Sequence, residues 1–169
     1  MNTIKLRTAT PDDAACIQAI YAYYVLNSVA TFEVKPPSIE EMKNRINIIL
    51  AEAYPFIVAI YNDKIVGFSY AKMYYGRDGF KPTVEDSIYV DNTMKGLKIG
   101  DLLLTELISQ CKKMGLKHMI AYVGGGEVNT ASIHLHKKHG FQLIGIYKNI
   151  GYKLGGYHDM AGLQLSLTP

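Results

Sequence analysis

The hydrophobic positions of this chain repeat with two periods. Apolar residues at every second position, many of them β-branched or aromatic, are typical of strands, and apolar residues three and four positions apart are typical of helices. The first pattern predicts strands at 4–9, 55–61, 65–75, 83–90, 117–123, 141–152 and 159–167. The second predicts helices from Pro11 to about Leu26, from Ser38 to a point before Pro55, from about Ile99 to Met114, and from Asn129 or Thr130 to Gly140.

Turn and cap residues agree with these elements. Thr10 and Pro11 provide an N-cap and a proline at the first helical position. The turn 62–64, Asn-Asp-Lys, joins two strands into an antiparallel hairpin, because Asn and Asp tolerate turn conformations. Gly115 is typical of a residue that ends a helix. The order of strand, two helices, three strands, helix, strand, helix and two strands predicts one α/β (α+β) domain over residues 1–169 with a mixed sheet.

Composition limits the functions to consider. The chain has 169 residues and is 49% hydrophobic, which is enough for one buried core. Its 18 basic and 15 acidic residues give a formal charge of +3 without any block of like charges. We therefore expect a mildly basic pocket for an anionic ligand and no nucleic-acid partner. The sequence shows no signal peptide and no apolar run long enough to cross a bilayer, so we expect a cytoplasmic protein that binds no membrane.

The cysteines and histidines do not follow metal-binding patterns. Cys16 and Cys111 lie on predicted helices without CxxC spacing, so we expect both to be reduced and buried. His134 and His139 fall on faces of their predicted helix that we expect at the surface. The histidines also have no ligand spacing with a carboxylate or a cysteine, so we expect no metal.

One segment, SIYVDNTMKGLKIGDLLL at 87–104, runs from a predicted strand through a basic loop into a predicted helix. Helix N-termini bind anions, because their first backbone N–H groups lack partners and the helix dipole adds roughly half a positive charge. The loop KGLKIG is neither a Walker A motif nor a Rossmann fingerprint. Taken alone, it is as typical of a solvated surface loop as of a phosphate site.

Five segments taken together resemble the GNAT superfamily of acyl-CoA-dependent N-acyltransferases, and within it the phosphinothricin acetyltransferase family. They are IYAYYVLNSVATFE, TVEDSIYVD, KGLKIGDLLL, NTASIHLHKKHGF and IGYKLGGYHDM, in the family's order and roughly its spacing. The resemblance implies a GNAT fold, with a mixed, mostly antiparallel sheet of about six to seven strands and about four flanking helices. It also implies that the strands at 84–90 and 117–123 splay apart.

The resemblance implies acetyl-CoA as co-substrate. The backbone of Ile88, Tyr89 and Val90 would pair with pantetheine, and N–H groups from Gly96 to Asp101 would hold the pyrophosphate. The matching cofactor-binding residues are Ile88, Tyr89, Val90, Lys95, Gly96, Leu97, Lys98, Ile99, Gly100, Asp101 and Asn129.

Two lysines in this loop depart from the family pattern Q/R-x-x-G-x-G/A. Lys95 stands in place of glutamine or arginine, and Lys98 in place of glycine. If position 98 requires a positive φ, Lys98 is strained by ~1 to 2 kcal/mol. We expect both lysines to supply point charges to the CoA phosphates, and Lys98 to offset the repulsion between Asp101 and a phosphate.

Acyl transfer to an amine requires a group that accepts the amine's proton. Glu85 is the first candidate for this general base and matches the family's glutamate. Strand alternation places Glu85 and Ser87 on one face and Asp86 and Ile88 on the other, so we expect one of the two carboxylates to face the acetyl group. His136 matches a family histidine, and it is either an acid or second base or a histidine packed on a helix face.

The resemblance implies a small amino-acid-like acceptor of the phosphinothricin, methionine sulfoximine or methionine sulfone type. Acetyl transfer would be direct within a ternary complex, without a covalent enzyme intermediate. The expected acceptor-binding residues are Thr31, Phe32, Tyr75, Gly76, Arg77, Lys81, Asp86 and Ser87. Two alternatives stay open, namely a different amine (a polyamine, an aminoglycoside or a protein N-terminus) and a non-catalytic CoA-binding regulatory domain. The segment GYKLGGYHD matches one that often lies near the family's dimer contact and the neighbouring active site, so the resemblance implies a homodimer.

Overall fold

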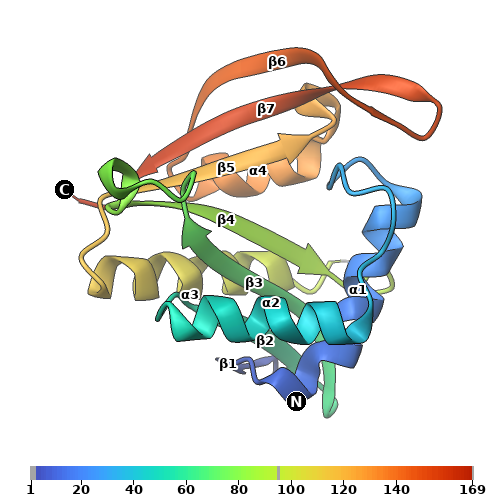
Figure 1. Cartoon of the computed structure of the whole chain (residues 1–169), viewed down its shortest axis with the longest axis vertical. Helices are drawn as coiled ribbons and strands as arrows, with labels where there is room; N and C mark the ends of the chain where they lie inside the picture. Colours follow the sequence, from blue (N-terminus) through green and yellow to red (C-terminus); the bar gives the residue numbers. More distant parts are fainter. Residues whose placement is uncertain (1–2, 95, 169) are drawn as a thin grey trace.

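A seven-stranded sheet forms the centre of the molecule in a computed structural model that describes residues 3–94 and 96–168. Its order is β1-β2-β3-β4-β5-β7-β6 (Figure 1). Neighbouring strands are antiparallel except for the parallel pair β4 and β5. The predicted mixed, mostly antiparallel sheet is therefore confirmed. The strands are β1 (Lys5–Thr8), β2 (Phe56–Tyr61), β3 (Lys64–Met73), β4 (Thr83–Val90), β5 (His118–Gly124), β6 (Gln142–Lys153) and β7 (Gly156–Ser166).

Four α-helices flank the sheet among the described residues, in the predicted order along the chain. They are α1 (Ala14–Asn27), α2 (Ile39–Ala51), α3 (Ile99–Lys113) and α4 (Thr130–Lys138). The first begins three residues later than predicted, because residues Pro11–Asp13 form a 3-10 turn. Two further 3-10 turns lie at Asp78–Phe80 and Gly126–Val128.

Strand β2 separates two hydrophobic cores. Phe56 and Val58 pack with α1 and α2, whereas Ile57 and Ala59 pack with α3 on the opposite face. A strand with both faces covered has a continuous apolar sequence instead of an alternating one, which accounts for the run FIVAI. The helices thus cover both faces of the first half of the sheet.

The predicted hairpin at 62–64 is present between β2 and β3. Asn62 and Asp63 have φ values of 49° and 59°. Two consecutive residues with positive φ match the right-handed twist of the flanking strands in a two-residue hairpin.

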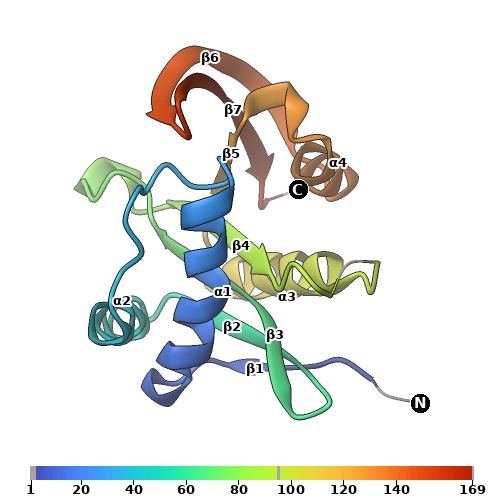
Figure 2. The ribbon, with the colours of Figure 1, turned by 90° about the vertical axis from the view of Figure 1, so that its right-hand side faces the viewer.

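The two halves of the sheet separate between β4 and β5. These strands pair only from Thr83↔His118 to Glu85↔Ile120. Beyond that point β4 continues along β3, while β5 continues along β7. Figure 2 shows the half built from β5, β6 and β7 standing apart from the half built from β1 to β4. The splay predicted for these two strands is therefore present, and it leaves one edge of β4 without a strand partner.

One prediction about the cysteines is wrong. Cys16 is exposed on α1, because it lies on the side of the helix turned away from the sheet. Cys111 is buried on α3 as expected, and burial together with the nearby Asp86 raises the pKa of its thiol to about 12. It is therefore a neutral thiol at physiological pH.

Two general properties of the described residues bear on function. None of the helices within 3–94 and 96–168 is long and apolar enough to span a bilayer. Nowhere in the same ranges do three side chains of the His, Cys, Asp and Glu types gather as ligands for a metal ion.

Candidate active site

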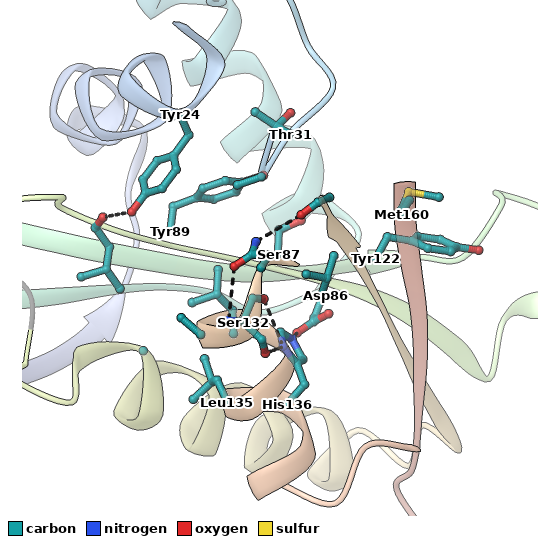
Figure 3. A pocket seen from close by; sticks show the side chains of 18 of the residues that line it. Tyr24, Thr31, Asp86, Ser87, Tyr89, Tyr122, Ser132, Leu135, His136 and Met160 are labelled. Atoms are coloured by element: carbon teal, nitrogen blue, oxygen red, sulfur yellow. Dashed lines mark hydrogen bonds and ion pairs between the residues drawn. The ribbon is translucent and has the colours of Figure 1, made fainter. Parts of the chain in front are cut away.

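A cavity of about 610 Å³ lies where β4 and β5 separate. Its walls come from α1, the α1–α2 loop, β4, the start of α3, the end of β5, α4 and β7 (Figure 3). The site residues expected from the sequence that line it are Thr31, Phe32, Glu85, Asp86, Ser87, Ile88, Tyr89, Val90, Gly100, Asn129 and His136. The fold thus brings the predicted catalytic and pantetheine-binding residues to one cavity.

The loop before α3 has the strained conformation considered for Lys98. Lys98 lies in the left-handed region, with φ 57° and ψ 23°, and forms the N-cap of α3. Gly96 has φ 82°. A Cβ at Gly100 would lie 3.3 Å from the Leu135 side chain of α4, so a larger residue there would push α3 and α4 apart. Lys95 lies outside the described residues.

Asp101 is neutralised differently from the expectation. Its carboxylate accepts bonds from Lys138 Nζ at 2.7 Å and His139 Nε2 at 2.9 Å. These bonds, first of all the one from Lys138, lower the pKa of Asp101. His139 is therefore a partly exposed hydrogen-bond partner between α4 and α3, and Lys138 instead of Lys98 is the lysine that pairs with Asp101.

Glu85 lies at the last position of β4 that pairs with β5 and is partly exposed to the cavity. Its Oε1 is 3.5 Å from Nζ of Lys72, which stands directly opposite on β3. The carboxylate of Glu85 therefore has one cationic neighbour and remains open to solvent. The sequence interpretation missed Lys72, although the position opposite Glu85 could have been found by counting along the hairpin.

Asp86 makes a buried ion pair with His136. Asp86 Oδ2 is 3.0 Å from Nε2 of His136, and Nδ1 of the same ring is 2.8 Å from the carbonyl oxygen of Ser132. Burial alone would lower the pKa of His136, but the Asp86 charge and the two hydrogen bonds raise it above its ordinary value. Phe141 packs edge-on against the ring. Asp86 and Ser87 were grouped as acceptor contacts, yet the side chain of Asp86 is directed to α4.

The α1–α2 loop is held over the cavity by Lys153 of β6. This lysine is only 4% exposed, and its Nζ donates to the carbonyl oxygens of Thr31 at 2.6 Å and Tyr24 at 3.3 Å. Burial lowers its pKa. Phe32 packs on Gly151, where a Cβ would lie 2.2 Å from the ring. The sequence interpretation placed this segment near a dimer contact and the neighbouring active site, but it missed the role of Lys153.

The opposite side of the same loop is held by α1 and α2. The hydroxyl of Tyr21 lies 2.9 Å from Thr31 Oγ1 and 2.8 Å from Glu33 Oε1. Arg45 of α2 donates to Glu33 at 2.7 Å. Thr31 and Phe32 are thus positioned from both sides.

The remaining predicted acceptor residues lie away from this cavity. Tyr75, Arg77 and Lys81 are exposed in the β3–β4 loop, where Lys81 pairs with Asp78. Gly76 lines a second cavity, next to Lys72 and Glu33.

Two tyrosines extend the polar wall of the first cavity. Tyr122 of β5 lines it, and its hydroxyl lies 2.6 Å from that of Tyr74. Tyr24 donates to the carbonyl oxygen of Val90 on β4. Helical periodicity cannot predict this contact, because it does not show which carbonyl a hydroxyl will reach.

Residues 6–161 match the family described as the acetyltransferase (GNAT) domain. This chain belongs to the GNAT acetyltransferase family. It is 36% identical to a phosphinothricin N-acetyltransferase of Alcaligenes faecalis over 163 residues, covering 96% of this chain and 82% of the relative. It is 32% identical to the L-methionine sulfoximine/L-methionine sulfone acetyltransferase of Pseudomonas aeruginosa over 167 residues, covering 97% and 95%.

A solved structure agrees with this membership. The crystal structure of a GNAT superfamily phosphinothricin acetyltransferase from Sinorhizobium meliloti in complex with AcCoA has a TM-score of 0.93 and 39% identity, covering 97% of this chain and 88% of that one. The expected family, fold and enzyme class are therefore confirmed. As a GNAT acetyltransferase, the chain uses acetyl-CoA as its co-substrate.

We expect Lys153→Met to loosen the α1–α2 loop. Methionine fills the space but donates no hydrogen bond, so two carbonyl groups lose a partner, and we expect the free energy of unfolding to fall by about 1 to 3 kcal/mol. Amide hydrogen exchange at 28–33 should become faster than in the wild type. Lys148→Met, at an exposed lysine of the same strand, is the control. Equal exchange rates in the wild type and Lys153→Met would contradict the role of Lys153.

Proposed function

We propose that this GNAT acetyltransferase transfers acetyl from acetyl-CoA directly to the amino group of a small amino-acid-like acceptor of the phosphinothricin, methionine sulfoximine or methionine sulfone type. The observation that carries this proposal is the cavity between β4 and β5, which places Glu85 beside an unpaired strand edge and the N-terminus of α3. The names of the relatives from Alcaligenes faecalis and Pseudomonas aeruginosa support this acceptor class. We place the reaction in the cytoplasm, where acetyl-CoA is available.

In this proposal the pantetheine arm completes the free edge of β4. An extended chain with amide groups can add to a strand edge as another strand would, and Ile88, Tyr89 and Val90 lie beyond the last residue that pairs with β5. The pyrophosphate then lies at the N-terminus of α3, where backbone N–H groups without helical partners bind anions. Asn129 bonds the carbonyl of Gly124 and the N–H of Ser132, which orders the cavity wall opposite β4.

Glu85 is the proposed general base. Its side chain is accessible, and it lies on the face of β4 that also presents Ser87. Nζ of Lys72 lies 3.5 Å from Oε1 of Glu85, and the general base must act as a carboxylate to accept a proton. Thr31, Phe32 and Ser87 line the same cavity and are the proposed acceptor contacts. Arg77 and Lys81 remain proposals for the acceptor's anionic groups, although their exposed β3–β4 loop does not line the cavity.

We expect Glu85→Gln to lower kcat by about 100-fold or more, because the loss of a positioned base typically has this effect. The KM for acetyl-CoA should change little, since the nucleotide contacts are elsewhere. Thiol release from acetyl-CoA, measured with methionine sulfoximine, methionine sulfone and phosphinothricin, gives the rate. Glu40→Gln at an exposed position of α2 is the control.

The same assay separates the alternatives when spermidine, an aminoglycoside and a short peptide are added to the panel. Turnover with one of these and none with the amino acids would contradict the acceptor class. Binding of acetyl-CoA without release by any amine would contradict the enzymatic proposal. Full activity of Glu85→Gln would contradict the proposal that Glu85 is the general base and would leave the proposed acetyltransferase activity standing.

We expect Lys98→Gly to weaken acetyl-CoA binding at low salt and to leave it nearly unchanged at high salt, because salt screens an exposed point charge. Glycine also accepts the positive φ of position 98, which should stabilise the fold by about 1 kcal/mol. Lys98→Gln should lose affinity without gaining stability. Calorimetric titrations at two salt concentrations test this, with Lys112→Gln at the other end of α3 as the control. Unchanged or tighter binding by Lys98→Gly at low salt would contradict a charge role.

We propose a homodimer formed through the β6–β7 hairpin. Its exposed large apolar and aromatic side chains are Leu143, Ile144, Tyr147, Ile150, Tyr152, Leu154 and Tyr157. Many exposed apolar side chains on a hairpin that includes the edge strand β6 are typical of a protein interface. Sedimentation should show a dimer that Ile150→Glu converts to a monomer, whereas Ile39→Glu on α2 should have no effect. A monomeric wild type would contradict the proposal.

A further inference from the structure

The ion pair between Asp86 and His136 lies at the base of the cleft between the two halves of the sheet. Asp86 is the first residue of β4 after Glu85, the last position that pairs with β5. His136 comes from α4, on the opposite wall, and Figure 3 shows the two side chains directed toward one another. Their exposures are 6% and 5%. The pair therefore joins the two walls of the cleft at the point where they begin to separate.

The hydrogen bonds of His136 determine how many protons the ring carries. Nδ1 is 2.8 Å from the carbonyl oxygen of Ser132. A carbonyl oxygen only accepts hydrogen bonds, so Nδ1 must carry a proton. Nε2 is 3.0 Å from Oδ2 of Asp86, and an ionised carboxylate likewise only accepts. With an ionised Asp86, Nε2 carries a proton as well, and the ring is an imidazolium.

The other groups around the pair agree with a charged ring. Cys111 on α3 is close enough for Asp86 to influence its thiol, which is neutral because its pKa is about 12. The Phe141 ring stands perpendicular to the imidazole ring and carries no charge, and Ser132 adds a hydroxyl 3.5 Å from Nδ1. Among the described residues, His136 is the basic side chain within ion-pair distance of Asp86. Because an ionised carboxylate is costly to bury without a cationic partner, an imidazolium is the form of His136 that stabilises an ionised Asp86.

We propose that Asp86 is a positioning residue that keeps His136 doubly protonated, so that His136 holds the base of the cleft as a fixed cation and exchanges no proton with the acceptor amine or the CoA thiol. This inference rests on the proposed acetyl transfer and narrows its chemistry. An imidazolium has no lone pair with which to accept a proton. If it released the proton on Nε2, a lone pair would face the carboxylate. Glu85 is then left as the group that accepts the proton of the amine.

The protonation state can be observed without any turnover. Long-range ¹H–¹⁵N correlation spectra of the histidine rings should show both nitrogens of His136 protonated at neutral pH in the wild type. In Asp86→Asn the amide can donate to Nε2, so the ring should be neutral with its proton on Nδ1. A neutral His136 ring in the wild type at pH 7 would overturn the proposal. Because the spectra need no acceptor, this result stands even if the proposed acceptor class is wrong.

A kinetic comparison tests the absence of proton exchange. His136→Gln alone leaves a buried unpaired carboxylate and should lower the unfolding midpoint, whereas Asp86→Asn/His136→Gln replaces the ion pair with a neutral hydrogen-bonded pair and should restore it. We expect the double variant to raise KM for acetyl-CoA while kcat stays within about threefold, since lost positioning affects binding before chemistry. Its kcat should keep the pH profile of the wild type. His134→Gln, at an exposed histidine of the same helix, is the matched control.

The opposite kinetic result would overturn the proposal. If His136 gives or takes a proton, the double variant, once refolding is verified by its unfolding midpoint, should lose about 100-fold or more in kcat. One limb of the pH profile should disappear at the same time. Glu85→Gln is assayed in parallel, because its activity tests whether Glu85 is the general base and is independent of whether His136 exchanges a proton.

Discussion

The structure depends on the short length of the parallel pairing between β4 and β5. Three residue pairs join the strands, and after Glu85 each strand follows a different neighbour. Because a strand edge without a partner exposes unpaired N–H and C=O groups, the separation creates a binding edge in the middle of a sheet. The cavity, the exposed face of Glu85 and the approach to the N-terminus of α3 all follow from this one interruption.

Buried polar contacts, and not only apolar packing, maintain the opening. Asp86 and His136 join the two walls, while Lys153 holds the α1–α2 loop through two carbonyl groups. Burial of charged groups is costly unless they are paired, so these contacts favour one arrangement of the walls over alternatives. They also bury Asp86 and leave Glu85 as the more accessible of the two carboxylates.

Local sequence predicted the elements well because their signals are local. Periodicity, the Asn62-Asp63 turn and the glycine after α3 each act within a few residues, and the structure has these elements in the predicted order. Cys16 and His139 were placed wrongly for a common reason. Exposure on a helix depends on what packs against each face, and neither the sheet beside α1 nor Asp101 beside α4 is visible from helical spacing alone.

The sequence by itself determined the fold class, the family and the short segment that presents Glu85 beside the expected pantetheine edge. The tertiary structure decided how the polar groups are paired. His136 reaches Asp86 across 50 positions, and Lys153 reaches Thr31 across 122. Strand alternation correctly placed the side chains of Glu85 and Asp86 on different faces of β4. Only the position of α4 in the fold shows that Asp86 has a histidine as its hydrogen-bond partner. The reason is physical, since propensities act between near neighbours in the chain, while the charge and protonation of a buried group depend on whichever partners the fold brings to it.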